Sequence, residues 1–273
     1  MKKFLLNKER VPANPPLEFA EKMVQEAMGA SEVISTGGGS TIDVGKYIAF
    51  KLGIPHTAIP TTAGTGSEVT KFAVFTDNNR KITIEDEKLI PSNYILKPEL
   101  LVSLPAIQTA SGGMDALCQA IESYWSKNAT DESRKYSVLA IDLVKENLVK
   151  SFLAPENLEY RQNMLMAANY SGRAINLTKT TVCHAISYPI TMHYNIPHGL
   201  ACSLSLAYFI KLNNFPLMHS YELEDLMLKL DINRQEILQD VDKELVAKEA
   251  FQSERINFNP VQVAKQDVIN SLN

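Results

Sequence analysis

The 273-residue sequence predicts an α/β domain followed by an all-helical domain. In the first hundred residues, short apolar strands alternate with helical segments and end in loops rich in glycine and threonine. This order is typical of a dinucleotide-binding sheet. After Pro105, strand patterns almost disappear and long amphipathic helices follow. We therefore place the boundary at residues 104–108, with an α/β domain over 1–106 and a helical domain over 107–273.

The elements of the first domain follow from local patterns. Residues 1–16 are polar with three prolines, and we expect an irregular lead-in. Helical spacing predicts a helix over 17–29 and another over 41–52. Extended segments are expected at a further set of short stretches. These are 32–35, 57–60, 71–76, 81–84, 94–96 and 101–102.

The second domain is predicted to be built of four long helices and a tail. Apolar residues recur at i, i+3 and i+4 over 108–127, 131–153, 156–177 and 198–214. The tail after Asp231 is charged and weakly amphipathic, which predicts peripheral helix.

The composition excludes several classes of partner. Hydrophobic residues make up 45% and charged residues 21%, as in an ordinary globular protein. The net charge of -4 gives no broad basic field, so we do not expect nucleic acid as a partner. No stretch has the length of a membrane span. The three cysteines, Cys118, Cys183 and Cys202, match no disulfide framework, and we expect a cytoplasmic protein.

Two loops follow predicted strands and have the composition of a cofactor site. In the first, three glycines allow the backbone to approach a pyrophosphate, and the next helix offers free N–H groups. The second loop alternates threonine and glycine, and together the two predict a dinucleotide crevice. A tight structural turn remains the alternative for the glycine loop. The candidate cofactor residues are Gly37, Gly38, Gly39, Ser40, Asp43, Thr61, Thr62, Thr65, Gly66 and Lys81.

Some of these candidates have equally plausible structural roles. Asp43 and Lys46 lie one turn into the helix after the first loop, where they orient the loop or cap the helix. Lys81 either reaches a cofactor ribose or is a solvated strand charge.

The stretch 181–199 holds three of the five histidines, and it predicts a metal site. His184 and His198 flank a break expected at Pro189, and His198 lies in a tight turn. Asp115 and Gln119 share one helix face at i and i+4. Together these four side chains offer carboxylate, amide and imidazole donors to one divalent ion, which would polarise an aldehyde oxygen. The alternative is that the histidines are ordinary polar loop residues. Glu122 is expected to be structural.

The same segments resemble the iron-containing (group III) alcohol dehydrogenase family from about Val33 to Ser203. Four motifs carry the resemblance, and they stand in the family's order. They are GGGSTIDVGK at 37–46, PTTAGTGSEVT at 60–70, GGMDALCQAIESY at 112–124 and HAISYPITMHYNIPHG at 184–199. The resemblance implies the dehydroquinate synthase-like architecture, NAD(H) or NADP(H), and a divalent metal, Fe²⁺ with Zn²⁺ as the alternative. We also expect a homodimer.

The resemblance identifies metal ligands and two departures from the family pattern. It implies Asp115, His184 and His198 as ligands and catalytic residues, while Gln119 stands where the family has histidine. A neutral amide is a poorer ligand than imidazole for iron or zinc. Tyr188 replaces another family histidine, so a proton relay there would use the phenol or water. His193 is a substitute or, more simply, a surface residue.

A narrower resemblance is to the branch assigned as phosphonoacetaldehyde reductases, which form 2-hydroxyethylphosphonate in phosphonate biosynthesis. It rests on MDALCQAIESYW at 114–125, INLTKTT at 175–181 and HAISYP at 184–189. Lys179, among three threonines, and Arg173 would hold the phosphonate. The structural alternative for Lys179 is a lysine that complements a helix C-terminus.

The resemblance also implies a shortened chain. The family's sequence begins about two βα units earlier, at the ~30-residue scale of such units. We therefore expect an incomplete dinucleotide-binding domain that lacks its first strands. Two other functions remain open: a general short-chain alcohol or diol dehydrogenase, and a non-catalytic remnant that serves as a dimerisation module.

Overall fold

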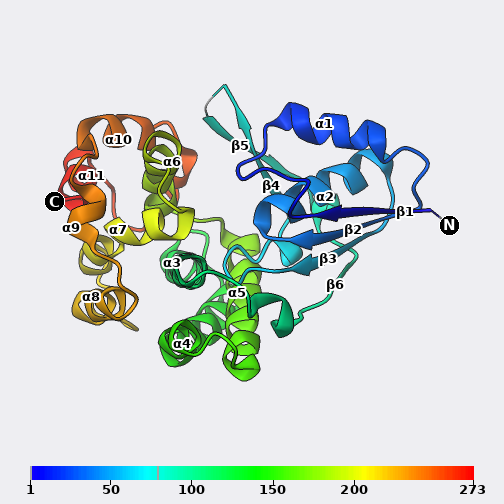
Figure 1. Cartoon of the computed structure of the whole chain (residues 1–273). Helices are drawn as coiled ribbons and strands as arrows, with labels where there is room; N and C mark the ends of the chain where they lie inside the picture. The colour runs from blue at the N-terminus through cyan, green and yellow to red at the C-terminus, as the bar shows by residue number, and fades with distance from the viewer. Residues whose placement is uncertain (1, 79) are drawn as a thin grey trace.

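A computed structural model describes residues 2–78 and 80–273, which form an N-terminal and a C-terminal part (Figure 1). A cleft lies between the two parts. The N-terminal part is built on a parallel four-stranded sheet of order β1-β2-β3-β6. Its strands are β1 (Lys3–Asn7), β2 (Glu32–Gly37), β3 (His56–Pro60) and β6 (Asn93–Tyr94). The C-terminal part is helical, so the predicted fold class is confirmed. The boundary at 104–108 stays a prediction.

Helices cover one face of the sheet. Helix α2 (Gly39–Leu52) contacts β1, β2 and β3, and α1 (Leu17–Glu26) packs against α2 (Figure 1). Strands β4 (Phe72–Asp77) and β5 (Arg80–Glu85) form a separate antiparallel hairpin beside α2. Phe75 of this hairpin stacks edge-on against Tyr47 with ring centroids 5.4 Å apart. The hairpin and the sheet thereby share one apolar core.

The prediction of an irregular lead-in was wrong for residues 3–7, which form the edge strand β1. Phe4 and Leu6 are buried, whereas Lys3, Leu5 and Asn7 are exposed. This alternation is the period of a strand with one covered face. The strand pairs in parallel with β2, with Leu5 opposite Ile34.

Six longer helices build the second part around one large apolar core. They are α3 (Ala106–Trp125), α4 (Asp131–Leu153), α5 (Leu158–Thr178), α6 (Val182–Tyr194), α7 (His198–Leu212) and α8 (Ser220–Lys229). The tail forms α9 (Arg234–Leu238), α10 (Lys243–Ala250), η4 (Glu254–Phe258) and α11 (Lys265–Ser271). Thr130 and Ser133 close a capping box at the start of α4, which satisfies two N–H groups that the helix cannot pair.

The expected break at Pro189 was wrong, because α6 continues through it to Tyr194. An interior proline costs a helix about 3 kcal/mol. Burial of Ala185, Ile186 and Ile190 against the neighbouring helices offsets that cost. Residues 101–102 were also predicted wrongly. Leu101 ends a 3₁₀ turn, η3 (Pro98–Leu101), which starts at a proline.

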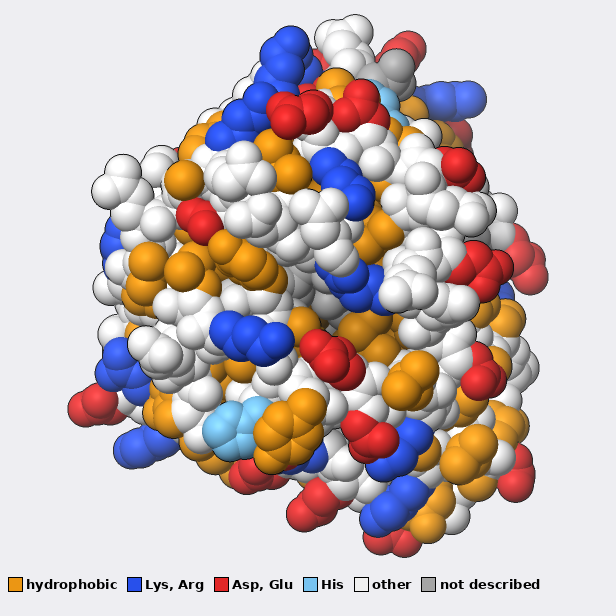
Figure 2. All heavy atoms as spheres, turned by 90° about the vertical axis from the view of Figure 1, so that its left-hand side faces the viewer, with side chains coloured by type: hydrophobic (Ala, Val, Ile, Leu, Met, Phe, Trp, Pro, Cys, Tyr) orange, Lys and Arg blue, Asp and Glu red, His pale blue; other side chains and the backbone are white. Residues whose placement is uncertain are grey.

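The surface carries mixed charge. On the helical face, acidic and basic side chains are interspersed with apolar ones (Figure 2). Within the described residues, no helix combines the length and the apolar character that crossing a membrane requires.

Candidate active site

A cleft of about 690 Å³ separates the sheet from the helical part. The loops after β2 and β3 line one side, and α3, α6 and the start of α7 line the other. In parallel sheets, ligands bind outside the carboxyl ends of the strands. Both predicted constellations, the glycine loops and the metal ligands, therefore open into one cavity.

The two loops after β2 and β3 lie against each other. Thr61 donates its N–H to the Gly37 carbonyl oxygen at 2.9 Å. A β-carbon on Gly39 would approach Thr65 Cγ2 to 2.7 Å, so only glycine fits there without a shift. Gly38 is the N-cap of α2, which directs the helix N-terminus into the cleft. Backbone N–H groups in this position bind anions such as a pyrophosphate.

Most of the predicted cofactor residues line the cleft. They are Gly38, Gly39, Ser40, Asp43, Thr62, Thr65 and Lys81. Three others, Gly37, Thr61 and Gly66, are not among its lining residues. Gly66 has φ of 59° and packs on α5, where a β-carbon would lie 2.4 Å from the Ala168 carbonyl oxygen. Its role in the structure is to let the loop approach α5.

Asp43 joins the second loop to the hairpin. Its carboxylate accepts hydrogen bonds from Ser67 Oγ and from the Val74 N–H. Lys46 is fully buried and donates to Thr70 Oγ1 and to the Phe72 carbonyl oxygen. Burial lowers the pKa of Lys46 to about 8, against the opposing pull of Asp43. These contacts favour the loop-orienting role over a helix cap.

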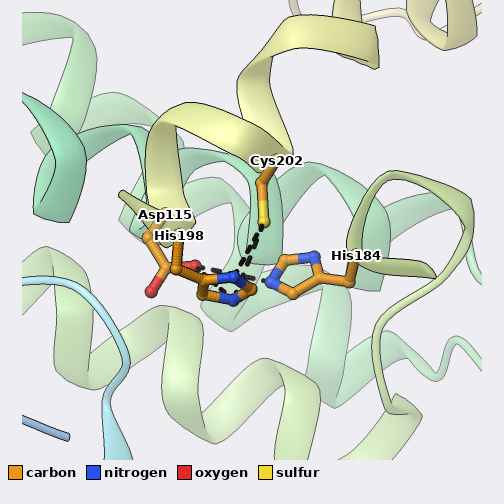
Figure 3. A group of neighbouring side chains, drawn as sticks. All are labelled: Asp115, His184, His198 and Cys202. Carbon is orange, nitrogen blue, oxygen red and sulfur yellow. Dashed lines mark hydrogen bonds and ion pairs between the residues drawn. The ribbon is translucent and has the colours of Figure 1, made fainter. Parts of the chain in front are cut away.

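Four side chains converge beside the helical wall of the cleft, and three of them, Asp115, His184 and His198, line it (Figure 3). Asp115 comes from α3, His184 from α6, and His198 and Cys202 from α7. One donor atom of each lies within 4.8 Å of all the others. The structure therefore brings together three of the four predicted ligands and adds a thiol.

The donor atoms are suited to a metal ion. In the described part of the chain, Asp115 Oδ1 and His184 Nε2 are buried, lie 3.4 Å apart and form no hydrogen bond. Two buried polar atoms without a partner would be costly, and a positive charge between them, a bound metal ion or a proton on Nε2, would remove that cost. Burial, together with Lys81, His184 and Arg255, holds the pKa of His198 well below its ordinary value. A neutral imidazole is the form that binds metal.

Glu122 fixes the orientation of His184. Its carboxylate receives hydrogen bonds from the ring Nδ1 of His184, from the Thr181 hydroxyl at 2.8 Å and from the Cys183 N–H at 2.7 Å. Burial alone would raise the pKa of Glu122, but His184 and the other donors outweigh it, and the pKa is lowered. Because Nδ1 carries the proton in this bond, the lone pair of Nε2 is left for a metal ion, and such a carboxylate partner is usual for a metal-bound histidine. Glu122 therefore has the structural role that was expected, and this role extends to orienting a residue of the site.

The sequence analysis did not identify Cys202 as a candidate ligand, whereas it did identify Gln119. Gln119 lines the cleft, but its side-chain oxygen already accepts a bond from Ser171 Oγ at 3.0 Å. Cys202 lies one turn after His198, with Sγ 3.8 Å from His198 Nε2. That i, i+4 spacing was the available signal. It was hidden because a buried cysteine usually acts as a small apolar residue.

Gly199 allows α7 to approach α3 closely enough for this site. A β-carbon there would lie 1.8 Å from the Ser111 carbonyl oxygen. We expect Gly199→Ala to lower the free energy of unfolding by about 2–3 kcal/mol through overpacking and to reduce bound metal. Thermal denaturation and metal analysis would measure both. Gly38→Ala is the matched control for stability, since its β-carbon would meet the flexible Thr62 side chain at 3.3 Å or more. Equal melting temperatures for the two variants would contradict this prediction.

Lys179 and Arg173, the residues predicted to bind the phosphonate, already have partners within the protein. Lys179 lines the cleft, but its ammonium pairs with Glu85 at 2.9 Å and Glu254 at 3.1 Å. Arg173 is not a lining residue, and it donates to Asn169 and to the Tyr94 hydroxyl.

The two candidates for a proton relay, Tyr188 and His193, lie in different places. Tyr188 lines the cleft beside His198, with ring centroids 5.9 Å apart. His193 pairs with Glu249 away from the ligand set, at 2.9 Å.

Comparison with known proteins gives consistent relatives. Over 159 residues the chain is 40% identical to a phosphonoacetaldehyde reductase of Streptomyces viridochromogenes, covering 58% of this chain and 40% of the relative. It is 36% identical over 201 residues to an NAD-dependent methanol dehydrogenase of Bacillus methanolicus, covering 66% and 53%. The chain spans about half the length of the curated relatives it matches.

A similar fold occurs among solved structures of oxidoreductases. The crystal structure of sulfoacetaldehyde reductase from Bifidobacterium kashiwanohense in complex with NAD⁺ superposes with a TM-score of 0.91 at 26% identity, covering 99% of this chain and 90% of the other. Residues 7–98 match the family model for iron-containing alcohol dehydrogenase. Residues 109–241 match the model for the C-terminal part of the Fe-containing alcohol dehydrogenase family. The chain therefore belongs to the iron-containing alcohol dehydrogenase family.

Proposed function

We propose that this chain is an NAD(P)-dependent, metal-assisted oxidoreductase that reduces a small aldehyde to an alcohol. The observation that carries the proposal is the single cleft that joins an anion-binding helix N-terminus to the Asp115, His184, His198 and Cys202 group. The helix N-terminus suits a dinucleotide pyrophosphate, and the group of four side chains suits a divalent ion. The family relationship supports the same pairing.

The residues of the cleft have distinct tasks in this proposal. The loops at Gly38–Gly39 and Thr62–Thr65 would hold the cofactor, and its reduced nicotinamide would supply the hydride. Asp115, His184, His198 and Cys202 would hold the cation, which acts as a Lewis acid on the aldehyde carbonyl. Glu122 keeps His184 in the orientation for that contact. Tyr188, next to His198, is the candidate group for passing a proton to the product oxygen.

The substrate that we propose is phosphonoacetaldehyde, reduced to 2-hydroxyethylphosphonate in phosphonate biosynthesis. Support comes from the relative of that name and from the structural similarity to a sulfoacetaldehyde reductase. Both of those names denote two-carbon aldehydes that carry an acidic group. A general short-chain alcohol dehydrogenase is the second candidate, favoured by the methanol and 1,3-propanediol dehydrogenases among the relatives. A cytoplasmic homodimer remains part of the proposal.

Initial rates with phosphonoacetaldehyde and propanal test the proposal. They would be measured anaerobically with NADH and NADPH, and with added Fe²⁺ or Zn²⁺. We expect kcat/KM to be at least about tenfold higher for the anionic aldehyde, the worth of one charge-assisted contact. Faster reduction of propanal would support the general dehydrogenase. No turnover with either aldehyde would refute the catalytic proposal and favour a non-catalytic remnant.

A further inference from the structure

Two cations from distant parts of the sequence meet at one ring in the cleft. Lys81 comes from β5, and Arg255 comes from η4 in the tail. The Lys81 Nζ lies 5.0 Å from the centroid of the Tyr188 ring, and the Arg255 guanidinium carbon lies 5.1 Å from the same centroid. All three side chains line the cleft. Because Tyr188 lies beside His198, both charges are next to the metal-binding group.

Neither cation forms a direct ion pair within the part of the chain that the structure describes. Among the described residues, no carboxylate oxygen lies within 4.0 Å of the Lys81 ammonium or the Arg255 guanidinium. The Arg255 guanidinium donates to the hydroxyls of Thr180 at 3.0 Å and Thr83 at 3.4 Å. Lys179, which also lines the cleft, has two carboxylate partners. The Lys81 and Arg255 pair therefore has no direct ion-pair partner among the described residues, although the charges of Asp115 and Asp43 act on Lys81 from further away.

Holding such a pair in a half-buried cleft is unfavourable without an anion. Burial and the neighbouring Arg255 lower the pKa of Lys81 to about 8, against the opposing pull of Asp115 and Asp43. The aromatic face of Tyr188 stabilises each cation, but an aromatic ring supplies only part of what a carboxylate would. An anionic group between the two would restore the balance and receive charge-assisted hydrogen bonds from both.

We infer that Lys81 and Arg255, positioned on Tyr188, form an anion subsite beside the metal group. It would take the phosphonate of a short phosphonylated aldehyde while the carbonyl lies at the Asp115, His184 and His198 end. The inference rests on the proposed function for the aldehyde half of the substrate. It assigns recognition of the phosphonate to Lys81 and Arg255 in place of Lys179 and Arg173. Among the described residues, neither Lys81 nor Arg255 forms an ion pair with a carboxylate.

Calorimetric titration with ethylphosphonate tests the subsite without any turnover. This probe carries the charged half of the proposed substrate and cannot be reduced. The metal-loaded protein would be titrated with and without saturating NAD⁺. We expect Lys81→Gln and Arg255→Gln each to weaken binding by about tenfold or more, the worth of one charge-assisted hydrogen bond. Arg255→Lys keeps the charge and is expected to recover part of the loss.

Two further variants complete the experiment. Lys145→Gln removes an ion-paired lysine near α8, outside the cleft, and it is the control for loss of charge alone. Lys179→Gln tests the rival assignment, and we expect ethylphosphonate binding to persist in it. Melting temperatures would show whether Arg255→Gln retains the fold, and Lys81→Gln provides an independent arm.

The outcomes separate this inference from the proposed function. Loss of binding in Lys179→Gln with retention in both Lys81→Gln and Arg255→Gln would overturn the subsite. So would the absence of binding to the wild-type protein, or displacement of ethylphosphonate by NAD⁺, which would assign the two cations to the cofactor. Ethylphosphonate binding that depends on Lys81 and Arg255, in a protein that reduces neither aldehyde, would support the subsite and refute the reductase proposal.

Discussion

Asp115→Ala is expected to remove the bound metal and to lower kcat/KM for aldehyde reduction by about 10³-fold or more, equal to about 4 kcal/mol of transition-state stabilisation. Asp115 supplies the one carboxylate of the ligand group, and therefore its only fixed negative charge when Cys202 is protonated. Its Oδ1 lies 3.4 Å from His184 Nε2 and 3.9 Å from His198 Nε2. Without it, two imidazoles and a thiol would face a divalent ion with little compensating charge.

The measurement pairs metal content with kinetics. The variant and the wild type would be loaded anaerobically, desalted and analysed for iron and zinc, and then assayed with the aldehyde that wild type prefers. Asp142→Ala, on an exposed position of α4, is the matched control, and we expect it to behave as wild type. An Asp115→Ala protein with unchanged metal content and turnover would refute the metal site.

Local patterns were sufficient for the parts of the fold that depend on nearest neighbours. The helix predicted over 131–153 has the bounds of α4, because it combines apolar spacing with a threonine cap. The strand–loop–helix order around Gly37 also follows from local sequence. In contrast, β1 is only five residues long, and its burial pattern is visible once β2 lies beside it. The tolerance of Pro189 depends likewise on packing from α7 and α10.

The same distinction holds for the cleft. Asp115, His184 and His198 were predicted because their residue types and spacing carry the chemistry themselves. Arg255 was not, because it lies in a tail that reads as peripheral helix and reaches the cleft only through the fold. The role of Glu122 also depended on tertiary contact, since its partners lie about sixty positions further along the chain.

Cys202→Ser is expected to weaken Zn²⁺ binding by at least about 100-fold, because even loss of an outer-shell partner costs about 10–100-fold in metal affinity. The reason is that Cys202 would take the place of Gln119 as the fourth ligand. Gln119 stands where the family has a histidine, and its oxygen is already bonded to Ser171. A thiolate from the next turn of α7 would supply the missing fourth donor, and thiolate favours zinc over iron.

A spectroscopic readout decides this without turnover. Cobalt-loaded wild-type protein should show a near-ultraviolet thiolate-to-cobalt charge-transfer band, and Cys202→Ser should lose it. Cys118→Ser is the matched control, since Cys118 is equally buried but lies outside the ligand group. If the band is absent from wild type, or persists in Cys202→Ser, sulfur is not a ligand and the fourth position belongs to Gln119 or water. If the band depends on Cys202, this chain has exchanged an imidazole on α3 for a thiolate on α7, and its metal preference moves from Fe²⁺ towards Zn²⁺.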